Sequence, residues 1–327
     1  MTKQVFIFLL FVLPLSAKAQ QQLRWVNVDS MYKPLPSTVH VYYTDQRIDT
    51  APFRAYYLVA DLNDRDLVFT TDTTQNRRLT PDGFYAKNEQ PLAIVNGTFF
   101  SFETNANLNV VIRKGRTLSF DNHVRALKGR DTLLYAKYLT SAIGISKNRK
   151  ADVAWIYNPQ GRKRPIAFEN GPILVKDSFA AVSQASFEPG LRHYPKTKKK
   201  HGVKEKWRMQ TAIGGGPVLV HNGQARITNN EEFKFPGKGI SDKHPRTAMG
   251  YTADGKLLIL VVEGRNPQAG GASLVQLAEI MIALGCVEAL NLDGGGSSCL
   301  LVNGKETIKP SDKVQRAVPA VFIIKGK

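Results

Sequence analysis

Short apolar runs separated by polar turns constrain the fold of this 327-residue chain more than any other feature. The runs have the length of β-strands, and clusters of Asn, Asp, Gly, Lys or Arg bound each of them, which is typical of strands joined by turns. Leu257–Val262 is apolar throughout, which predicts a strand buried on both faces. The predicted strands are Ala55–Ala60, Leu92–Val95, Asn109–Ile112, Ala142–Ile145, Val153–Ile156, Ile173–Val175, Val218–Val220, Leu257–Val262, Val287–Leu292, Leu300–Val302 and Ala320–Ile324.

One helix is predicted from its capping residues. Ser273 and Gln276 have the spacing of a capping box, in which two side chains satisfy free backbone N–H groups at the start of a helix. Apolar residues then recur at helical spacing until Gly285 ends the helix. A strand, a helix and a strand over Leu257–Leu292 predict a βαβ unit with a right-handed crossover. A weaker helix is predicted over Ser178–Phe187.

These elements predict a mixed α/β or α+β fold. We expect residues 55–327 to form one domain built on a large, twisted, mixed β-sheet with few helices. Residues 20–54 are polar and contain Pro34 and Pro36, so we expect them to form an N-terminal arm.

Residues 1–19 resemble a secretory signal peptide. Lys3 provides a charged start, Val5–Leu15 is apolar but too short to span a bilayer, and Ala17-Lys18-Ala19 offers a cleavage site after Ala19. We therefore expect a periplasmic or secreted protein with no stable membrane insertion. Export makes chemistry that depends on ATP or NAD unexpected, and no cofactor is predicted.

The charge of the chain favours an anionic partner. It has 45 Lys and Arg against 27 Asp and Glu, a formal net charge of +18. Residues 192–208 form a basic insertion, which is either a solvated loop or an electrostatic collar that gathers an anionic substrate. Nucleic acid is not the expected partner, because few aromatic residues interleave these lysines and because the chain is predicted to be exported.

The sequence does not support a zinc hydrolase, while a structural Ca²⁺ on the Asp-rich turns stays an open alternative. The His-Glu-x-x-His pattern of zinc hydrolases is absent, and two cysteines cannot form a four-cysteine zinc site. Cys286 and Cys299 could form a disulfide in an exported protein. Two buried thiols are the favoured interpretation, because both cysteines lie among apolar residues.

The segment Asn291–Ser298 is the strongest candidate for a functional site. It follows an apolar strand directly, and its three glycines allow a sharp turn and a close approach to a ligand. Successive N–H groups of such a turn can bind an anion, and Asp293 stands at the end of the strand. The alternative is a glycine-rich hairpin turn capped by Asp293.

Three further segments lie at predicted strand ends or starts. Asn96–Phe100 carries two aromatic residues, which belong either to the core or to a sugar-binding surface. His244–Gly250 contains Arg246, which is placed to bind a phosphate through two hydrogen bonds. Glu263–Arg265 follows the buried strand, and its two charged residues could form a simple ion pair.

Together these four segments resemble the phosphodiester glycosidase domain family, which includes the enzyme that uncovers mannose 6-phosphate. The resemblance runs in order over about residues 90–325, and Pro310-Ser-Asp312 and Arg316 match the C-terminal pattern of the family. Two positions depart from it: Thr98 replaces a glycine, and Glu263 stands where aspartate is more usual. The basic insertion is not part of the pattern.

The resemblance implies hydrolysis of the bond between the anomeric carbon of an N-acetylglucosamine-like sugar and a phosphodiester on an anionic glycan or envelope polymer. It assigns Arg246 and Arg265 to the phosphate, Asp293 as base or nucleophile, and Glu263 as the partner or the orienter of Asp293. Phosphate is a good leaving group, so little general-acid assistance is needed. The implied substrate-binding residues are Asn96, Gly294, Gly295, Gly296, Ser297 and Ser298.

A non-catalytic binding protein for an anionic polysaccharide is the alternative. The glycine-rich turn would then hold phosphate without any reaction. Substitutions distinguish the two, because a binder loses affinity in steps whereas an enzyme loses turnover and keeps some binding.

Overall fold

The computed structural model describes residues 23–120, 124–126, 135–137, 139–158, 163–169, 174–175, 178–181, 203–204 and 207–327. The predicted signal peptide and most of the basic insertion 192–208 lie outside these residues. No helix in the described part is long and apolar enough to cross a membrane.

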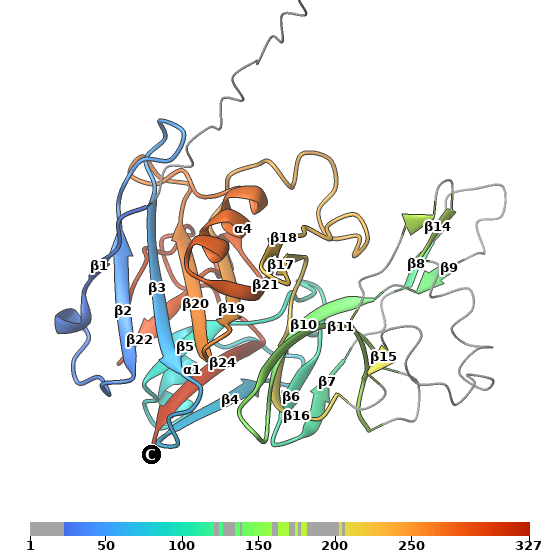
Figure 1. Ribbon diagram of the computed structural model, residues 1–327, viewed down its shortest axis with the longest axis horizontal. Helices are drawn as coiled ribbons and strands as arrows, with labels where there is room; N and C mark the ends of the chain where they lie inside the picture. Colours follow the sequence, from blue (N-terminus) through green and yellow to red (C-terminus); the bar gives the residue numbers. More distant parts are fainter. Residues whose placement is uncertain are drawn as a thin grey trace, which may run out of the picture.

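An eight-stranded sheet forms one side of the molecule (Figure 1). The helix α4 (Leu274–Ala283) packs on its outer face. In spatial order its strands are β1 (Val26–Asn27), β2 (Val39–Thr44), β3 (Arg54–Asp61), β20 (Lys256–Glu263), β19 (Arg246–Thr252), β21 (Cys286–Asn291), β17 (Val218–His221) and β18 (Gln224–Ala225).

A seven-stranded and a five-stranded sheet complete the domain. The seven-stranded sheet has the order β15 (Val203–Lys204), β12 (Ile166–Phe168), β11 (Ala151–Tyr157), β10 (Thr140–Ser146), β16 (Met209–Gly214), β6 (Val111–Arg113) and β7 (Arg116–Ser119). The five-stranded sheet has the order β23 (Lys305–Glu306), β22 (Leu300–Val302), β5 (Ala93–Asn96), β24 (Ala320–Gly326) and β4 (Leu67–Thr73).

The remaining elements are short. Two pairs of strands stand apart from the large sheets: β8 (Val124–Ala126) with β9 (Tyr135–Lys137), and β13 (Leu174–Val175) with β14 (Ser178–Ala181). The helical elements besides α4 are α1 (Pro81–Lys87), η1 (Asp29–Met31) and η2 (Gly295–Ser297).

Every predicted strand corresponds to a strand of the structure, and the described residues contain only two α-helices. The predicted mixed sheet is wrong, because every strand pair among the described residues is antiparallel. The weaker helix predicted over Ser178–Phe187 is also wrong where it can be compared, since Ser178–Ala181 is strand β14, which pairs with β13.

The predicted βαβ unit is not present as a pair of neighbouring parallel strands. The strand, the helix and the strand exist as β20, α4 and β21, but β19 lies between the two strands and is antiparallel to both. The reason is local. The turn at Asp254-Gly255 joins β19 and β20 as a hairpin, so β19 takes the place beside β20.

Residues 23–54, expected as an arm, contribute β1 and β2 to the edge of the eight-stranded sheet. Val39 and Val41 of β2 are buried there against the main core. The alternation of buried and half-buried residues along β2 is the pattern of a strand with one face on the core.

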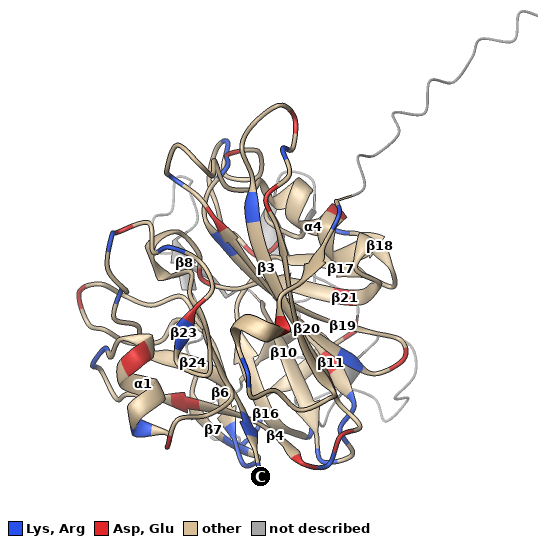
Figure 2. Ribbon diagram, turned by 90° about the vertical axis from the view of Figure 1, so that its left-hand side faces the viewer, with Lys and Arg blue, Asp and Glu red and all other residues tan. Residues whose placement is uncertain are grey.

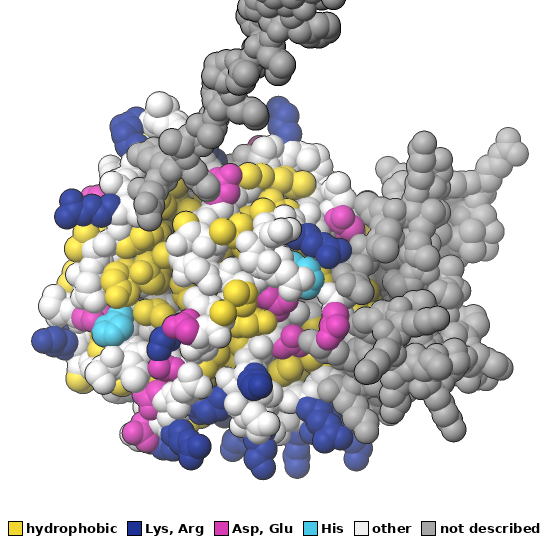
Figure 3. Space-filling model, in the orientation of Figure 1, with side chains coloured by type: hydrophobic (Ala, Val, Ile, Leu, Met, Phe, Trp, Pro, Cys, Tyr) yellow, Lys and Arg dark blue, Asp and Glu magenta, His cyan; other side chains and the backbone are white. Residues whose placement is uncertain are grey.

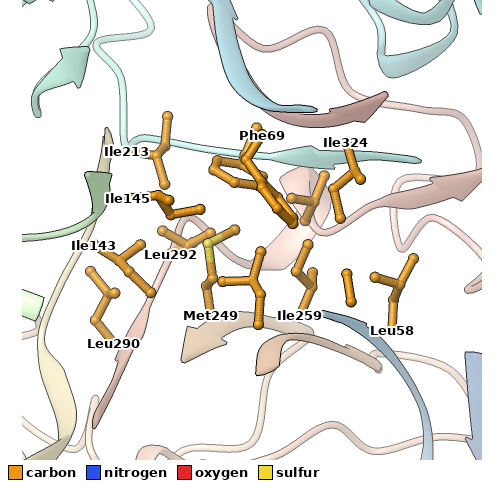
Figure 4. Close-up of a cluster of buried hydrophobic side chains, with 14 of the residues drawn as sticks. Leu58, Phe69, Ile143, Ile145, Ile213, Met249, Ile259, Leu290, Leu292 and Ile324 are labelled. Atoms are coloured by element: carbon orange, nitrogen blue, oxygen red, sulfur yellow. The ribbon is translucent and has the colours of Figure 1, made fainter. Parts of the chain in front are cut away.

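One hydrophobic core holds the three large sheets together. Figure 4 shows side chains from all of them meeting at its centre. The eight-stranded sheet contributes Leu58, Met249, Ile259 and Leu290, the seven-stranded sheet Ile143, Ile145 and Ile213, and the five-stranded sheet Phe69 and Ile324. Burial of these apolar side chains is the main favourable term in folding.

Strand β20 is buried on both faces, as the sequence predicts. Leu257, Ile259 and Val261 face this core, while the alternate residues face a second cluster that includes α4. The predicted capping box of α4 is also present. The Gln276 N–H donates to Ser273 Oγ at 3.1 Å, and the Ser273 N–H donates to Gln276 Oε1 at 3.0 Å.

Both cysteines are free and buried, in agreement with the favoured interpretation. Cys286 begins β21 of the eight-stranded sheet, and Cys299 precedes β22 of the five-stranded sheet. Burial raises the pKa of Cys286 to about 12, so this thiol stays protonated.

Charged residues lie mainly in turns and at strand ends, whereas most of the strand surface is uncharged (Figure 2). On the face drawn in Figure 3, Lys and Arg side chains gather along the lower edge, where the C-terminus lies in Figure 1. This distribution agrees with the excess of basic residues in the sequence.

Three connections carry the chain from one sheet to another and meet at one place, which we call the sheet junction. Residues 97–110 lead from β5 to β6, residues 215–217 from β16 to β17, and residues 292–299 from β21 to β22. The Asp293 N–H donates to the carbonyl of Gly97 at 3.1 Å, and the Gly216 N–H donates to the carbonyl of Asn291 at 2.7 Å. The three connections therefore fix one another.

Substitution of Gly215 tests how tightly the sheet junction is packed. A Cβ at this position would meet the carbonyl oxygen of Asn291 well inside contact distance. We expect Gly215→Ala to lower the free energy of unfolding by roughly 1–3 kcal/mol, because backbone must move to admit a methyl group. Urea denaturation measures this difference.

Gly326→Ala is the matched control, since a Cβ there would have no neighbour within 4 Å. We expect it to change the stability by less than about 0.5 kcal/mol. Equal stability of the Gly215→Ala and native proteins would show that the junction is loosely packed.

Candidate active site

Asp293 lies at the sheet junction, directly after strand β21. Its side chain is partly buried and accepts a hydrogen bond from the Gly294 N–H at 2.9 Å. Burial raises the pKa of Asp293 to about 6, although hydrogen bonds from Ser297 and Gly294 and the charge of Arg316 oppose this rise. A carboxyl group with such a pKa can gain and lose a proton near neutral pH.

The glycine turn after Asp293 is a single turn of 3₁₀ helix, η2. Most of its N–H groups already have acceptors inside the protein: Gly294 bonds Asp293 Oδ1, Gly295 bonds the carbonyl of Pro245, and Ser297 and Ser298 bond carbonyls of the turn. Among the described residues this leaves the N–H of Gly296 for a ligand. The predicted nest of successive free N–H groups is therefore not supported.

Two arginines approach this turn so closely that glycine is required. Gly295 has φ of +60°, and the Arg265 guanidinium nitrogens lie 3.2 Å from the position of a Cβ. A Cβ on Gly296 would overlap Asp312 and Arg316. The glycines thus admit cationic side chains to the backbone of the turn.

Arg316 links the C-terminal segment to the turn. Its Nε donates to Asp312 Oδ2 at 3.0 Å, and its Nη1 lies 3.4 Å from Ser297 Oγ. The hydroxyl of Ser297 in turn forms a hydrogen bond with the Asp293 carboxyl group, which lowers the pKa of Asp293. Arg316 and Asp312 are therefore part of the site, although the sequence indicates them only through the family pattern.

Arg246 is buried and bound to backbone carbonyls. Its Nε donates to Ala272 at 3.1 Å, its Nη2 donates to Asp242 at 3.0 Å, and its guanidinium stands over the ring of Phe235. Burial and the neighbouring Arg265 lower the pKa of Arg246 to about 10, so it remains charged. This geometry differs from the predicted two-pronged phosphate grip, because the guanidinium is already committed to the protein.

Arg265 is exposed beside Arg246 and near His244, whose Nδ1 lies 3.5 Å from Arg265 Nη2. Burial and both arginines lower the pKa of His244, which is therefore neutral at pH 7. Neither Arg246 nor Arg265 has a carboxylate ion-pair partner in the described part of the chain. The region beside the turn is therefore electropositive and suited to an anion.

Glu263 does not form the ion pair with Arg265 considered from the sequence. It is buried, its Oε1 accepts from Asn266 at 3.0 Å, and Arg54 lies 3.7 Å away on the neighbouring strand. Its Oε2 accepts from the backbone N–H of Lys309 at 3.2 Å. These contacts make Glu263 a positioning residue that fixes the start of the segment leading to Asp312.

Asn96 is fully buried, and its side chain is bonded within the protein. Its Nδ2 donates to the carbonyl of Asp293 at 2.6 Å, and its Oδ1 accepts from Thr247 Oγ1 at 2.8 Å and from the Cys299 N–H at 3.0 Å. Direct binding of sugar by Asn96 is not supported by this geometry. The residue instead holds both ends of the glycine turn.

The two serines of the turn differ. Ser297 is buried and contacts Arg316, whereas the hydroxyl of Ser298 is buried with no hydrogen-bond partner in the described part. A buried hydroxyl without a partner is costly. Ser298 therefore has a free group that a ligand or water could satisfy.

Lys234 and Glu232 also lie at the sheet junction, and sequence analysis misses both. Lys234 packs against Gly216 with its Nζ 5.1 Å from the centre of the Phe99 ring, and burial lowers its pKa to about 8. Glu232 is fully buried and accepts hydrogen bonds that include the Val218 N–H at 3.0 Å and Trp155 Nε1 at 3.2 Å. Both stand in a polar loop without a recognisable motif, so no sequence signal marks them.

The two aromatic residues of Asn96–Phe100 differ in burial, and only Phe100 lies in a hydrophobic core. Phe100 is buried in a small core with Phe84 and Ile94. Phe99 is only partly buried and contacts Phe235 edge to face, with 5.9 Å between ring centres. No group of His, Cys, Asp and Glu side chains among the described residues could hold a metal ion.

The profile of the phosphodiester glycosidase family matches residues 147–325. This match covers more than half of the chain, and the chain belongs to that family. Members of the family are hydrolases of sugar phosphodiesters, and the four predicted segments meet at the sheet junction.

Similar proteins agree with this assignment. The chain is 41% identical over 104 residues to the bovine N-acetylglucosamine-1-phosphodiester alpha-N-acetylglucosaminidase, which is 32% of this chain and 20% of that protein. It is 42% identical over 79 residues, 24% of this chain and 12% of the other, to the SPbeta prophage-derived uncharacterized protein YomE of Bacillus subtilis. The matches thus span a fifth or less of these relatives.

Solved structures share the fold. The catalytic domain of the zebrafish N-acetylglucosamine-1-phosphodiester alpha-N-acetylglucosaminidase, auto-inhibited by its pro-peptide, has a TM-score of 0.58 at 20% identity, covering 90% of this chain and 85% of that one. A hypothetical protein from Synechocystis has a TM-score of 0.60 at 15% identity, covering 93% and 64%.

The high pKa of Asp293 predicts a stability cost at neutral pH. A carboxyl that binds its proton more tightly when folded favours the folded state at low pH, and this advantage is lost as the pH rises through 6. We expect Asp293→Asn to raise the free energy of unfolding at pH 7 by roughly 1–3 kcal/mol. Denaturant unfolding of both proteins at pH 4 and 7 measures the difference, and an unchanged pH dependence would contradict it.

Substitution of Asn96 should lower the stability of the protein, the opposite of the effect expected for Asp293→Asn. Asn96→Ala leaves the buried Thr247 hydroxyl and Cys299 N–H without acceptors, so we expect a loss of roughly 2–4 kcal/mol of unfolding free energy. Thermal or urea unfolding checks this, with the exposed Asn148→Ala as the control. Equal stability of the two variants would show that Asn96 does not hold the two ends of the glycine turn in place.

Proposed function

We propose that this protein hydrolyses the bond between the anomeric carbon of an N-acetylglucosamine-like sugar and a phosphodiester on an anionic glycan or envelope polymer. The observation that carries the proposal is the placement of Arg265 and Arg316 on the two sides of the glycine turn that begins with Asp293. The two arginines can bind an anion next to the Asp293 carboxyl group, which can exchange a proton.

The leaving phosphate is bound by cationic groups. The exposed guanidinium of Arg265 and that of Arg316 contact it, and the Gly296 N–H supplies a backbone donor. Arg246 lies beneath Arg265 as a buried charge without a carboxylate partner and acts through its field. Fixed positive charge at the point where negative charge develops lowers the barrier of such a reaction.

Asp293 acts at the anomeric carbon. In its ionised form it accepts a proton from water as the water oxygen attacks that carbon. The bond between the anomeric carbon and the phosphate oxygen breaks, and its electron pair leaves with the phosphate. A single carboxylate is sufficient, because this leaving group needs little protonation by an acid.

The segments around Asp293 hold this geometry. Asn96 fixes the Asp293 carbonyl, and Glu263 fixes the segment that carries Asp312 and Arg316. Positioning by a second layer of hydrogen bonds keeps reacting groups in place. We also propose that residues 1–19, which resemble a secretory signal peptide, direct the protein to the periplasm or out of the cell.

Release of free sugar from UDP-N-acetylglucosamine by residues 20–327 tests the proposal. We expect Asp293→Asn to lower kcat by about 10³-fold, as loss of a general base does. Because the ionised form is active and the pKa is about 6, kcat/KM should fall as the pH decreases below 6. Asp66→Asn, a substitution of an exposed aspartate far from the turn in sequence, is the control and should retain full activity.

The outcomes separate the alternatives. Release by Asp293→Asn at the native rate would remove Asp293 from the reaction. No release from a panel of sugar phosphodiesters, combined with binding of an anionic polysaccharide, would support the non-catalytic binding protein. Inverted anomeric configuration in the product supports the base role, whereas retention would make Asp293 the nucleophile.

A further inference from the structure

A basic cleft lies beside the candidate active site, between the end of β4 and the start of α1. Its volume is about 490 Å³, and its lining includes Thr73, Arg77, Arg78, Leu79 and Lys87. Three of these residues are cationic and none of the lining residues is acidic. Arg77 and Arg78 of this lining are exposed, and Figure 2 shows α1 at the edge of the molecule.

The positive charge of the cleft is not cancelled by its surroundings. Lys87 is paired with the buried Asp72 at 2.8 Å, but Arg113 shares the same carboxylate at 2.9 Å, so one charge remains from this group. Arg77 and Arg78 are exposed and have no carboxylate ion-pair partner in the described part of the chain. The cleft therefore carries an excess of positive charge that an oxyanion can neutralise.

Phe102 connects the cleft to the glycine turn. The Arg78 guanidinium carbon lies 5.5 Å from the centre of the Phe102 ring, and that of Arg316 lies 5.4 Å from the same centre. Arg316 in turn contacts Ser297 of the turn. Phe102 nevertheless keeps 64% of its surface exposed, which is unusual for phenylalanine and leaves a ring available for stacking.

The cleft is held rigidly against the same C-terminal segment as the site. Thr73 Oγ1 donates to the carbonyl of Pro319 at 2.9 Å. Leu79 and Val318 exchange two backbone hydrogen bonds, of 3.0 and 2.9 Å. Arg316 therefore stands on a segment whose continuation forms part of the wall behind the cleft, so the two binding regions keep a constant separation.

We propose that Arg77, Arg78 and Lys87 bind a second oxyanion of the substrate, on the part that leaves with the phosphate, while Phe102 supports the sugar ring between them. This inference rests on the proposed function and narrows its substrate class. The preferred substrate is a phosphodiester-linked glycan with a further phosphate or carboxylate one sugar beyond the cleaved bond. A diester of a neutral alcohol makes no ionic contact with these three cationic residues.

Two diesters that differ by one phosphate test the inference. In one, phosphate joins C1 of N-acetylglucosamine to the 6-hydroxyl of methyl mannoside; in the other, it joins C1 to the 6-hydroxyl of mannose 1-phosphate. We expect the native protein to prefer the second by about tenfold in kcat/KM, an effect typical of charge-assisted hydrogen bonds. A third diester, in which phosphate joins C1 to the 6-hydroxyl of carboxymethyl mannoside, shows whether carboxylate serves as well as phosphate.

The double variant Arg77→Gln/Arg78→Gln should lose this preference, so that its kcat/KM values for the two diesters become equal. Lys147→Gln/Lys150→Gln is the matched control, because it removes two exposed lysines from the β10–β11 turn. It should keep the preference. Added salt should weaken the preference in the native protein, because it screens exposed charges.

Binding measurements test the second binding region without requiring catalysis. In the Asp293→Asn protein, the second diester should bind about tenfold more tightly than the first, and this difference should vanish when Arg77→Gln/Arg78→Gln is added. Equal affinity for the two diesters, or a preference that survives the double variant, would overturn the second binding region. Hydrolysis of neither diester by the native protein, with the binding difference intact, would refute the proposed function alone.

Discussion

The side chain of Asn96 is the contact on which the site depends, because it joins two sheets where the chain passes between them. Asn96 ends β5 of the five-stranded sheet, and its amide bonds Thr247 of β19 in the eight-stranded sheet. The same amide holds Asp293 and Cys299 at the two ends of the glycine turn. Buried amide hydrogen bonds of this kind are expensive to break, so the position of the carboxyl group follows from the packing of the sheets.

The charges around the glycine turn determine the chemical properties of the candidate site. Burial raises the pKa of Asp293, and Arg246 and Arg265 have no carboxylate ion-pair partner in the described part of the chain, whereas Arg316 is paired with Asp312. Arg246 is bound to carbonyl oxygens and fixed, whereas Arg265 is exposed and Arg316 reaches the turn from the C-terminal segment. The site thus combines a fixed internal charge with cationic groups that face a ligand, an arrangement suited to phosphate.

Much of the fold could be predicted from the sequence. Strand lengths, turn residues and the capping box at Ser273 are local signals, and all of these elements form where they are predicted. The pairing of strands is not local. β19 enters between β20 and β21 through a hairpin, so the predicted parallel neighbours are separated by an antiparallel strand. Residues 23–54 join the sheet because Val39 and Val41 are needed to cover the core.

The sequence by itself determined the strands, the glycine turn and the family, because each of these is recorded in consecutive residues, and it made Asp293 a candidate site residue. Only the tertiary structure decided which polar groups remain available to a ligand. Asn96, Arg246 and Glu263 have suitable chemistry for a substrate, yet each is bonded to groups that are distant in sequence. Arg316 and Phe102 meet only because separate sheet connections converge. Hydrogen bonds between distant segments depend on how the sheets pack, and no local pattern records that packing.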